Sequence, residues 1–464
     1  MAKYLYGASV QGIQDYIFAT NKLQEIVGAS EIVKKINEDF EKKFDDESDV
    51  EILLNAAGNI KAIFHDIEDC QKHIKEYEKG ILQEACGLTL SQVVQKINED
   101  ETIEEAIKEL EKKLKIQRNK PTIPIDSSLS IMKHNPRTAR PAILEGRDLA
   151  TQQKVEANKE FYKKNPSVKE FKEFSYISNV KNKIAIIHID GNGLGQIVPK
   201  LNEKISSFSK KLDEATKKAV KDAKNENMHL REIIVGGDDV TVVCDADDAL
   251  TFTKNFLDYF EKYTQDIDEL AGITSKLTAC AGIAYCNEKY PFHYAVGLAE
   301  ALCGVAKNHA KREASCLMFH NIQSSNFQEW DTFVADELTI KNDKQVIRCD
   351  FGAYYLNKKN EPLIEDFINT VEAYRCEGSP INNLRNWMSE LHKSEKNAQN
   401  LLHRINKVVK QKGTWKCEIM DKNLKFFHKE LSNDKLLIQK NGHLKTPVYD
   451  ILQILSVTTN GSKK

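Results

Sequence analysis

The sequence predicts an α+β protein with two sheets of ferredoxin-like strand order, followed by a mainly helical C-terminal domain. Between Lys183 and Phe319, strand-like and helix-like segments follow one another in the order β, α, β, β, α, β, α, β. A fainter copy of this order begins near Lys3. After about Gln323 the pattern changes again: DELTIKND and VIRCDFGAYYL are strand-like or irregular, and helical spacing dominates from Leu363 to Val409. The domains predicted from these changes are 1–111, a connector with some helix at 112–180, 181–322 and 323–464.

The unit at 181–322 has the clearest elements. Lys183–Ile189 is an unbroken apolar run, typical of a strand buried on both faces, and it ends at Asp190. Apolar runs flank the tight turn GGDD at 236–239, which predicts a hairpin. We expect helices packed on one face of this sheet. The remaining predicted elements are helices from Gln196 to about Asp222, Ala246 to about Tyr263 and His293 to Arg312, and strands at Lys276–Tyr285 and Ser315–Phe319.

The first unit reads as a degenerate copy of the second. The strand KYLYGAS, a helix and the hairpin VEILLNAAGNIKAIF repeat the order of KIAIIHID through REIIVGGDDVTVVC. In this overlay Ser9 stands near the place of Asp190, and Ala57, Gly58 and Asn59 stand near those of Gly237, Asp238 and Asp239. The first copy therefore lacks the carboxylates of the second. The alternative is two unrelated α+β units that share a common element order.

Composition and charge exclude several classes of protein. The chain has 464 residues, of which 41% are hydrophobic and 29% charged, which is typical of an ordinary globular protein. Its 67 Lys and Arg residues nearly balance 69 Asp and Glu residues, so we expect any contact with nucleic acid to be local. No apolar run reaches the ~20 residues of a membrane span, and the start lacks a signal-peptide pattern. We therefore expect a cytoplasmic protein without membrane contact.

Ten cysteines are spread along the chain without any CxxC pair. A zinc knuckle or a disulfide framework would need closer spacing. We expect reduced, mostly buried thiols.

Three carboxylates are predicted to meet at one end of the second sheet. Asp190 ends a buried strand, and Asp238 and Asp239 lie in the turn of the neighbouring hairpin. Two ionised carboxylates about 4 Å apart repel by about 4 kcal/mol at an effective dielectric constant of 20, so such a cluster takes up protons or holds cations. Oxygen ligands favour two Mg²⁺ or Mn²⁺ ions, which suit displacement at phosphorus. The pattern predicts nucleotidyl transfer, with these residues as metal ligands and catalytic groups.

Two glycine-rich turns complete the predicted site. Gly236 and Gly237 allow a tight turn and the close approach of a base or phosphate. The turn after Asp190 opens a helix, so its backbone amides are expected to receive a triphosphate. Its nucleotide-binding candidates are Gly191, Asn192, Gly193 and Leu194. The alternative is a surface turn with capping Asp residues.

Four motifs carry a family resemblance. IHIDGNGLG, VGGDDVTVV, LTACAGIAY and AEALCGVAKNHAK together resemble the palm domain shared by GGDEF diguanylate cyclases and the large polymerase-like subunit of type III CRISPR effector complexes. In the cyclases, a helix of the form ADxALYxAKxxGR supplies phosphate-binding cations. The matching positions are Lys307 and Lys311, whose spacing of four would place both on one helix face. The alternative is a pair of solvent-exposed lysines.

Two further segments favour the CRISPR subunit. The N-terminal YGASVQGIQDYIFATNKLQEIVGASEIV resembles its first palm, and TPVYDILQILSVT resembles its terminal helical domain. The resemblance implies synthesis of cyclic oligoadenylates from ATP, with the degenerate palm holding a second nucleotide. It also implies CRISPR effector proteins and guide or target RNA as partners.

The sequence departs from that family in two places. The family usually begins with an HD nuclease domain, but here the palm-like strand starts at Lys3 and no histidine precedes His65. His65-Asp66 lacks the further spaced ligands of such a nuclease, and we expect Asp66 to cap a helix instead. The cysteine-rich zinc element is replaced by KHNPRTARPA. The resemblance is therefore to a short form without the nuclease domain.

Several functions remain open from the sequence. One is a stand-alone cyclic-dinucleotide synthase using ATP or GTP, because no motif reports the base. Another is a non-catalytic scaffold subunit of an RNA-guided complex. A homodimer is required if the first unit does not supply the second face of the site.

Overall fold

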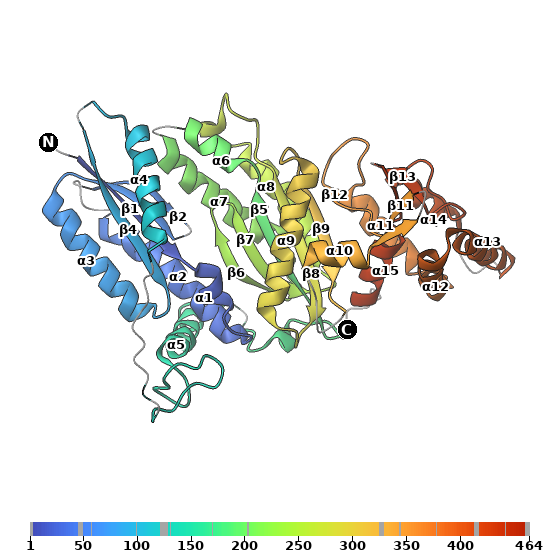
Figure 1. Ribbon diagram of the computed structural model, residues 1–464, viewed down its shortest axis with the longest axis horizontal. Helices are drawn as coiled ribbons and strands as arrows, with labels where there is room; N and C mark the ends of the chain where they lie inside the picture. The colour runs from blue at the N-terminus through green and yellow to red at the C-terminus, as the bar shows by residue number, and fades with distance from the viewer. Residues whose placement is uncertain are drawn as a thin grey trace.

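A computed structural model gives the architecture of the chain. It describes residues 3–459 except for 45–49, 57, 99, 121–128, 130, 169, 202–203, 324–328, 343–344, 377, 413–416 and 441. Two α+β units and a mainly helical C-terminal part follow one another along the long axis (Figure 1). This arrangement confirms the predicted fold class of two palm-like units and a helical domain.

The second palm is built on a six-stranded sheet of order β12-β9-β8-β5-β7-β6. Central β5 pairs antiparallel with both β7 and β8. The strand β12 comes from the C-terminal part of the chain and pairs with β9. The strands are β5 (Lys183–Gly191), β6 (Leu230–Gly236), β7 (Asp239–Asp245), β8 (Ala279–Asn287), β9 (Cys316–Asn321) and β12 (Tyr354–Tyr355).

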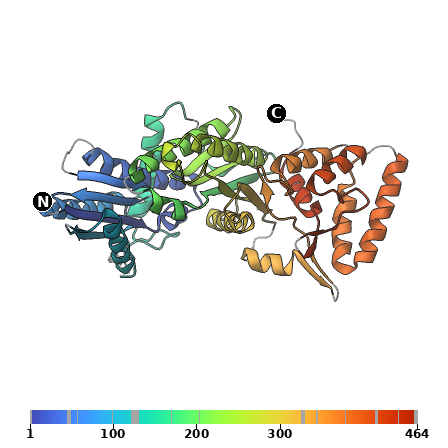
Figure 2. The ribbon, with the colours of Figure 1, turned by 90° about the horizontal axis from the view of Figure 1, so that it is seen from above.

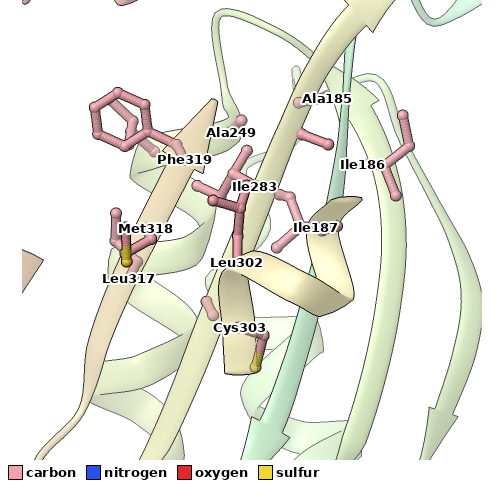
Figure 3. Packing of buried hydrophobic residues seen from close by; sticks show 14 of the residues in the cluster. Ala185, Ile186, Ile187, Ala249, Ile283, Leu302, Cys303, Leu317, Met318 and Phe319 are labelled. Carbon is pink, nitrogen blue, oxygen red and sulfur yellow. The ribbon is translucent and has the colours of Figure 1, made fainter. Parts of the chain in front are cut away.

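Both faces of this sheet are covered by helices. In Figure 2, α7 (Ile205–Ala223) and α8 (Ala249–Thr264) lie on one side, and α9 (Phe292–Ala310) lies on the other. The expectation that the helices pack on one face was therefore wrong. The physical reason is the β5 core, whose residues are buried on both faces and need two covering layers. Figure 3 shows side chains of β5, β8, β9 and α9 gathered in that core.

The first palm repeats this arrangement strand by strand. Its sheet has the order β2-β3-β1-β4, and central β1 pairs antiparallel with β3 and β4. Separate apolar clusters fill its two faces, one containing Tyr6 and Phe40 and the other containing Leu5 and Leu110. The elements are β1 (Lys3–Gln11), α1 (Ile13–Phe18), α2 (Leu23–Phe44), β2 (Val50–Ala56), β3 (Asn59–Phe64), α3 (Ile67–Glu84), β4 (Thr89–Ile97) and α4 (Ile103–Arg118).

Two local predictions had different outcomes. Asp66 caps α3, its carboxylate accepting a hydrogen bond from the Glu68 N–H at 3.0 Å, as expected. The helix predicted from Gln196 to Asp222 is interrupted. A single turn, α6 (Leu194–Ile197), runs into a 3₁₀ turn that contains Pro199, and α7 begins only at Ile205. Proline disfavours a helical conformation in the residue before it, which breaks a long helix.

The two palms contact each other through helix α2. Arg231 of β6 lies 3.6 Å from Glu31 of α2 and stacks over the ring of Phe161. Phe161 belongs to α5 (Leu149–Lys164), the connector helix that packs along α2. These contacts join helices α2 and α5 to β6, the edge strand of the second sheet.

The C-terminal part combines helices with a small sheet. Within the described chain, no helix has the length and apolarity needed to cross a membrane. The helices are α10 (Trp330–Asp336), α11 (Ile364–Tyr374), α12 (Ile381–Lys393), α13 (Glu395–Lys412), α14 (Cys417–Phe427) and α15 (Val448–Val457). The sheet has the order β10-β11-β14-β13, with β10 (Thr339–Asn342), β11 (Gln345–Arg348), β13 (Ile438–Lys440) and β14 (His443–Lys445). Strands β10 and β11 fall within or overlap the segments DELTIKND and VIRCDFGAYYL, which the sequence predicts to be strand-like or irregular.

Candidate active site

Strand register brings the three predicted carboxylates together. Asp190 near the end of β5 lies directly opposite Asp239 at the start of β7. Asp238 occupies the turn just before β7, and its side chain shares a hydrogen bond with that of Asp190. Three acidic side chains thus meet at one end of the second sheet, where its buried central strand β5 ends.

Helix α7 holds the hairpin turn in place. Gly237 has a φ of 60°, a left-handed conformation that glycine adopts without steric cost. Its N–H donates to Asp213 Oδ1 at 3.3 Å, and the Thr216 hydroxyl donates to its carbonyl oxygen at 2.6 Å. Gly236, the last residue of β6, pairs with Asp239. The turn is therefore anchored, so that Asp238 and Asp239 have defined positions.

Gly191 allows the strand end and the turn to approach closely. Its N–H donates to the carbonyl oxygen of Asp238 at 3.2 Å. A Cβ at this position would lie 2.8 Å from the Asp238 Cβ, which is closer than such atoms pack. Glycine at this position brings the Asp238 backbone against the end of β5.

The charges of the cluster raise the proton affinity of two carboxylates. Burial, followed by the negative charge of Asp190, raises the pKa of Asp238 to about 6. Burial and the charges of Asp190 and Asp238 raise the pKa of Asp239 to about 7. A site that resists holding its own negative charge gains free energy from a bound cation.

Lys307 supplies one positive charge from within the protein. This buried residue in the last turn of α9 places its Nζ 2.5 Å from Asp190 Oδ2. The same ammonium donates to the Gly191 carbonyl oxygen at 2.8 Å. Helix α9 is thereby tied to the end of β5.

The remaining oxygens fit hard divalent cations. Among the residues that the structure describes, no three acidic, histidine or cysteine side chains already form a metal-ligand group. Asp239 Oδ1, however, is buried without a hydrogen-bond partner, and its nearest basic neighbour, His188 Nδ1, is 3.5 Å away. An orphan carboxylate oxygen beside two further carboxylates is the donor set that Mg²⁺ and Mn²⁺ prefer.

The raised pKa values predict a pH-dependent difference in stability. Without divalent ions, folded Asp238 and Asp239 bind protons up to about pH 6 and 7, whereas the unfolded chain loses them near pH 4. The folded state thus holds more protons between about pH 4 and 7, and the free energy of unfolding falls as pH rises through that window. As the pH rises, the melting temperature of wild type should fall relative to that of Asp238→Asn/Asp239→Asn. Mg²⁺ should remove this difference in melting temperature. A difference that stays constant with pH would contradict the raised pKa values of Asp238 and Asp239.

The other predicted nucleotide-binding residues divide into buried and open positions. Asn192 is buried, and its amide group donates to Thr278 Oγ1 at 3.0 Å, so it positions the turn from behind. Gly193, with a φ of 76°, and the half-buried Leu194 begin a helix of one turn only. The turn therefore opens a single helical turn, not the long helix that was expected, and the contribution of a helix dipole is small.

Lys311 does not share a helix face with Lys307. Helix α9 ends at Ala310, and Lys311 follows it with a φ of 53°, exposed to solvent. The prediction of two lysines on one face was therefore wrong. The helix ends one residue before Lys311, and Lys311 itself has a left-handed backbone conformation.

Sequence reasoning missed two side chains near the carboxylates. His188 lies on β5, buried beside Thr241 at 3.2 Å, and burial lowers its pKa to about 4. Glu300 on α9 is half-buried, and its charge helps to raise the pKa of Asp239. A polar residue inside the apolar run KIAIIHI, and a carboxylate seven residues before Lys307, were the available signals.

The first palm carries a neutralised version of the same site. Ser9 lies opposite Asn59 in the register that pairs Asp190 with Asp239. The Ser9 hydroxyl donates to Asn59 Oδ1 at 2.9 Å. Arg118, in the last turn of α4, donates to Ser9 Oγ at 2.8 Å, as Lys307 reaches Asp190 from α9. The predicted equivalence of Ser9 and Asn59 with the carboxylates is confirmed, and Ala57 lies outside the described residues.

Fold and site together define a palm domain: a central strand and an adjacent hairpin present carboxylates at one sheet edge. A family model described as Cas10/Cmr2, second palm domain, matches residues 183–316. Residues 183–316 are therefore similar to the second palm domain of Cas10/Cmr2 proteins. No curated protein sequence gives a significant match.

Solved structures share this fold at low identity. A chain of the Csm1-Csm4 cassette in complex with cA3 has a TM-score of 0.59 and 15% identity, over 98% of this chain and 69% of that one. The cassette in complex with cA4 gives 0.56 and 14% over the same shares. The cassette with pppApA gives 0.49 and 17% over 68% of this chain and 54% of that one, so this chain spans about half of that relative.

Proposed function

We propose that the second palm catalyses metal-dependent nucleotidyl transfer from ATP and makes a cyclic oligoadenylate in CRISPR-type antiviral defence. The observation that carries the proposal is the meeting of Asp190, Asp238 and Asp239 with buried Lys307 in a Cas10/Cmr2-type palm. Structures of similar fold contain cA3, cA4 and AMPPNP, which supports adenine nucleotides as the ligands.

Each residue has a role that follows from its position. The three carboxylates would hold two Mg²⁺ or Mn²⁺ ions. Such ions lower the pKa of an attacking hydroxyl and neutralise a leaving pyrophosphate. Lys307 offers a fixed positive charge beside the phosphates, and Gly236 and Gly237 present no side chain that would block them.

The reaction balances without a further reactant. A ribose 3′ or 2′ hydroxyl oxygen bonds to the α-phosphorus of ATP, and the bond from that phosphorus to the bridging oxygen breaks. Pyrophosphate leaves with the bonding electrons, and the hydroxyl proton passes to solvent. Repetition and a final intramolecular attack close the ring.

The first palm is proposed to hold the second nucleotide without a metal ion. In the first palm, Ser9 and Asn59 stand at the positions of Asp190 and Asp239. Arg118 gives this part of the first palm a positive charge. Such a site suits a phosphate directly. The chain would then provide the binding sites for both nucleotides itself, and a homodimer would not be needed.

Arg118→Ala should weaken ATP use without unfolding the protein. Removing a charge-assisted contact to phosphate is expected to raise KM by roughly 10-fold or more. The control is Lys115→Ala, which removes another basic residue from the last turn of α4. Equal KM values for both variants in a pyrophosphate-release assay would exclude the first palm as a phosphate site.

Two alternatives are separated by simple observations. A cyclic-dinucleotide synthase that uses GTP would release pyrophosphate from GTP, whereas we expect release with ATP and little with GTP. One that uses ATP would be recognised by a product of two nucleotide units. A scaffold subunit would release none and would instead copurify with RNA and partner subunits. Type III effector proteins and target RNA are added as a further arm, because an enzyme of this class can require its partners.

A further inference from the structure

Helix α9 contains two glycines that packing does not explain. A Cβ added at Gly297 or Gly304 would meet no atom within 4 Å, and both positions are exposed. Glycine is unfavourable inside a helix compared with alanine. By contrast, Gly282 of β8 is required by packing, since its Cβ would lie 1.9 Å from the Ala299 carbonyl oxygen. Packing therefore does not account for glycine at these two positions of α9.

Gly304 lies between two charged residues on one face of α9. Glu300 precedes it by four residues and Lys307 follows it by three, which are the spacings of neighbours on a helix surface. Lys307 is fixed against Asp190 and the Gly191 carbonyl. One end of this face therefore borders the catalytic carboxylates.

The other end of the face borders the first palm. The half-buried Glu300 carboxylate lies close enough to Asp15 of α1 for that charge to act on it. Phe18 of α1 also packs against Phe292 at the start of α9, with ring centroids 5.7 Å apart. The Glu300–Gly304–Lys307 face thus runs from the metal site towards the junction of the two palms.

We propose that Glu300 and Gly304 bind the nucleoside part of the nucleotide whose phosphates contact Lys307. Seven helical residues span about 10 Å, so the phosphate and nucleoside ends of one nucleotide can lie along this face. The bare backbone at Gly304 lets the sugar rest against the helix. The Glu300 carboxylate accepts hydrogen bonds from the ribose hydroxyls, two adjacent donors that suit its two oxygens. This inference rests on the proposed function of the second palm.

Discrimination between ATP and deoxy-ATP tests the role of Glu300. Binding of ATP, 2′-deoxy-ATP, 3′-deoxy-ATP and ITP is measured by calorimetry with Mg²⁺ present, on wild type and Glu300→Gln. Wild type should prefer ATP over a deoxy analogue by about 10-fold, and the variant should lose that preference. An unchanged preference would overturn the ribose contact. A variant that instead loses discrimination between ATP and ITP would place the contact on the base and also overturn it.

Two glycine substitutions test the close approach. Gly304→Ala and Gly297→Ala should both raise the melting temperature, because the added methyl group clashes with nothing and alanine favours a helix. Only Gly304→Ala should weaken ATP binding, by about 10-fold, because Gly297 lies two turns further from Lys307. ATP binding at wild-type strength in Gly304→Ala would exclude the sugar from this position.

Binding measurements keep the inference separate from the proposed reaction. If wild type binds and turns over ATP but the Glu300 and Gly304 variants discriminate as wild type does, only this inference fails. If wild type binds no nucleotide, the proposed function fails with it.

Discussion

Replacing Asp238 and Asp239 by asparagine is expected to lower ATP turnover by at least about 10³-fold and to leave the fold intact. Asparagine has nearly the shape of aspartate, so the register of β7 and the turn held by α7 should persist. The amide groups carry no negative charge and bind divalent ions poorly. Because the substitution also removes repulsion with Asp190, the metal-free variant should melt at or above the wild-type temperature at pH 8.

The matched control is Asp266→Asn/Asp268→Asn, which neutralises two exposed carboxylates of the same domain. It should retain wild-type turnover in a pyrophosphate-release assay. Full activity in the Asp238/Asp239 variant would remove these residues from the reaction. Loss of activity accompanied by an unfolded circular dichroism spectrum would mean that the carboxylates are needed for folding, which the structure does not predict.

The second large effect is expected at Lys307. Lys307→Met keeps the apolar length of a buried side chain but removes the ammonium that contacts Asp190 Oδ2 and the Gly191 carbonyl. Loss of a fixed positive charge beside the reacting phosphates should reduce kcat/KM by about 10²-fold or more. Lys311→Met, at an exposed position beyond the helix end, should change it by less than about 3-fold.

Steady-state kinetics on both lysine variants checks this contrast. Equal losses at Lys307 and Lys311 would mean that the exposed Lys311 also contributes to phosphate binding. An unchanged kcat/KM in Lys307→Met would mean that this residue only ties α9 to β5.

The carboxylate cluster could be predicted because its signals are local. An apolar strand that ends in Asp190, and two apolar runs around GGDD, each define an element from neighbouring residues. Once β5 and the hairpin share a sheet, the sheet order places Asp190 opposite Asp239. The repeat was visible for the same reason, since it depends on element order rather than on contacts.

The remaining features depend on contacts between distant residues. The backbone amide of Asn192 was expected to receive a phosphate, but its N–H donates to the carbonyl oxygen of Thr278, 86 positions away. Arg118 meets Ser9 across 109 positions, and no local pattern shows that pairing. Helix α9 ends before Lys311 because the chain takes a left-handed turn towards β9, and the spacing of residues in the sequence does not indicate that turn.

Mass analysis of the products formed from ATP shows directly whether this protein makes a cyclic oligoadenylate. The protein is incubated with ATP and Mn²⁺, alone and with type III effector proteins and target RNA, beside the Asp238→Asn/Asp239→Asn variant. We expect wild type to form a ring of AMP units without a terminal triphosphate, and we expect the variant to form none. ATP left unchanged under every condition, or a ring made equally well by the variant, would contradict it.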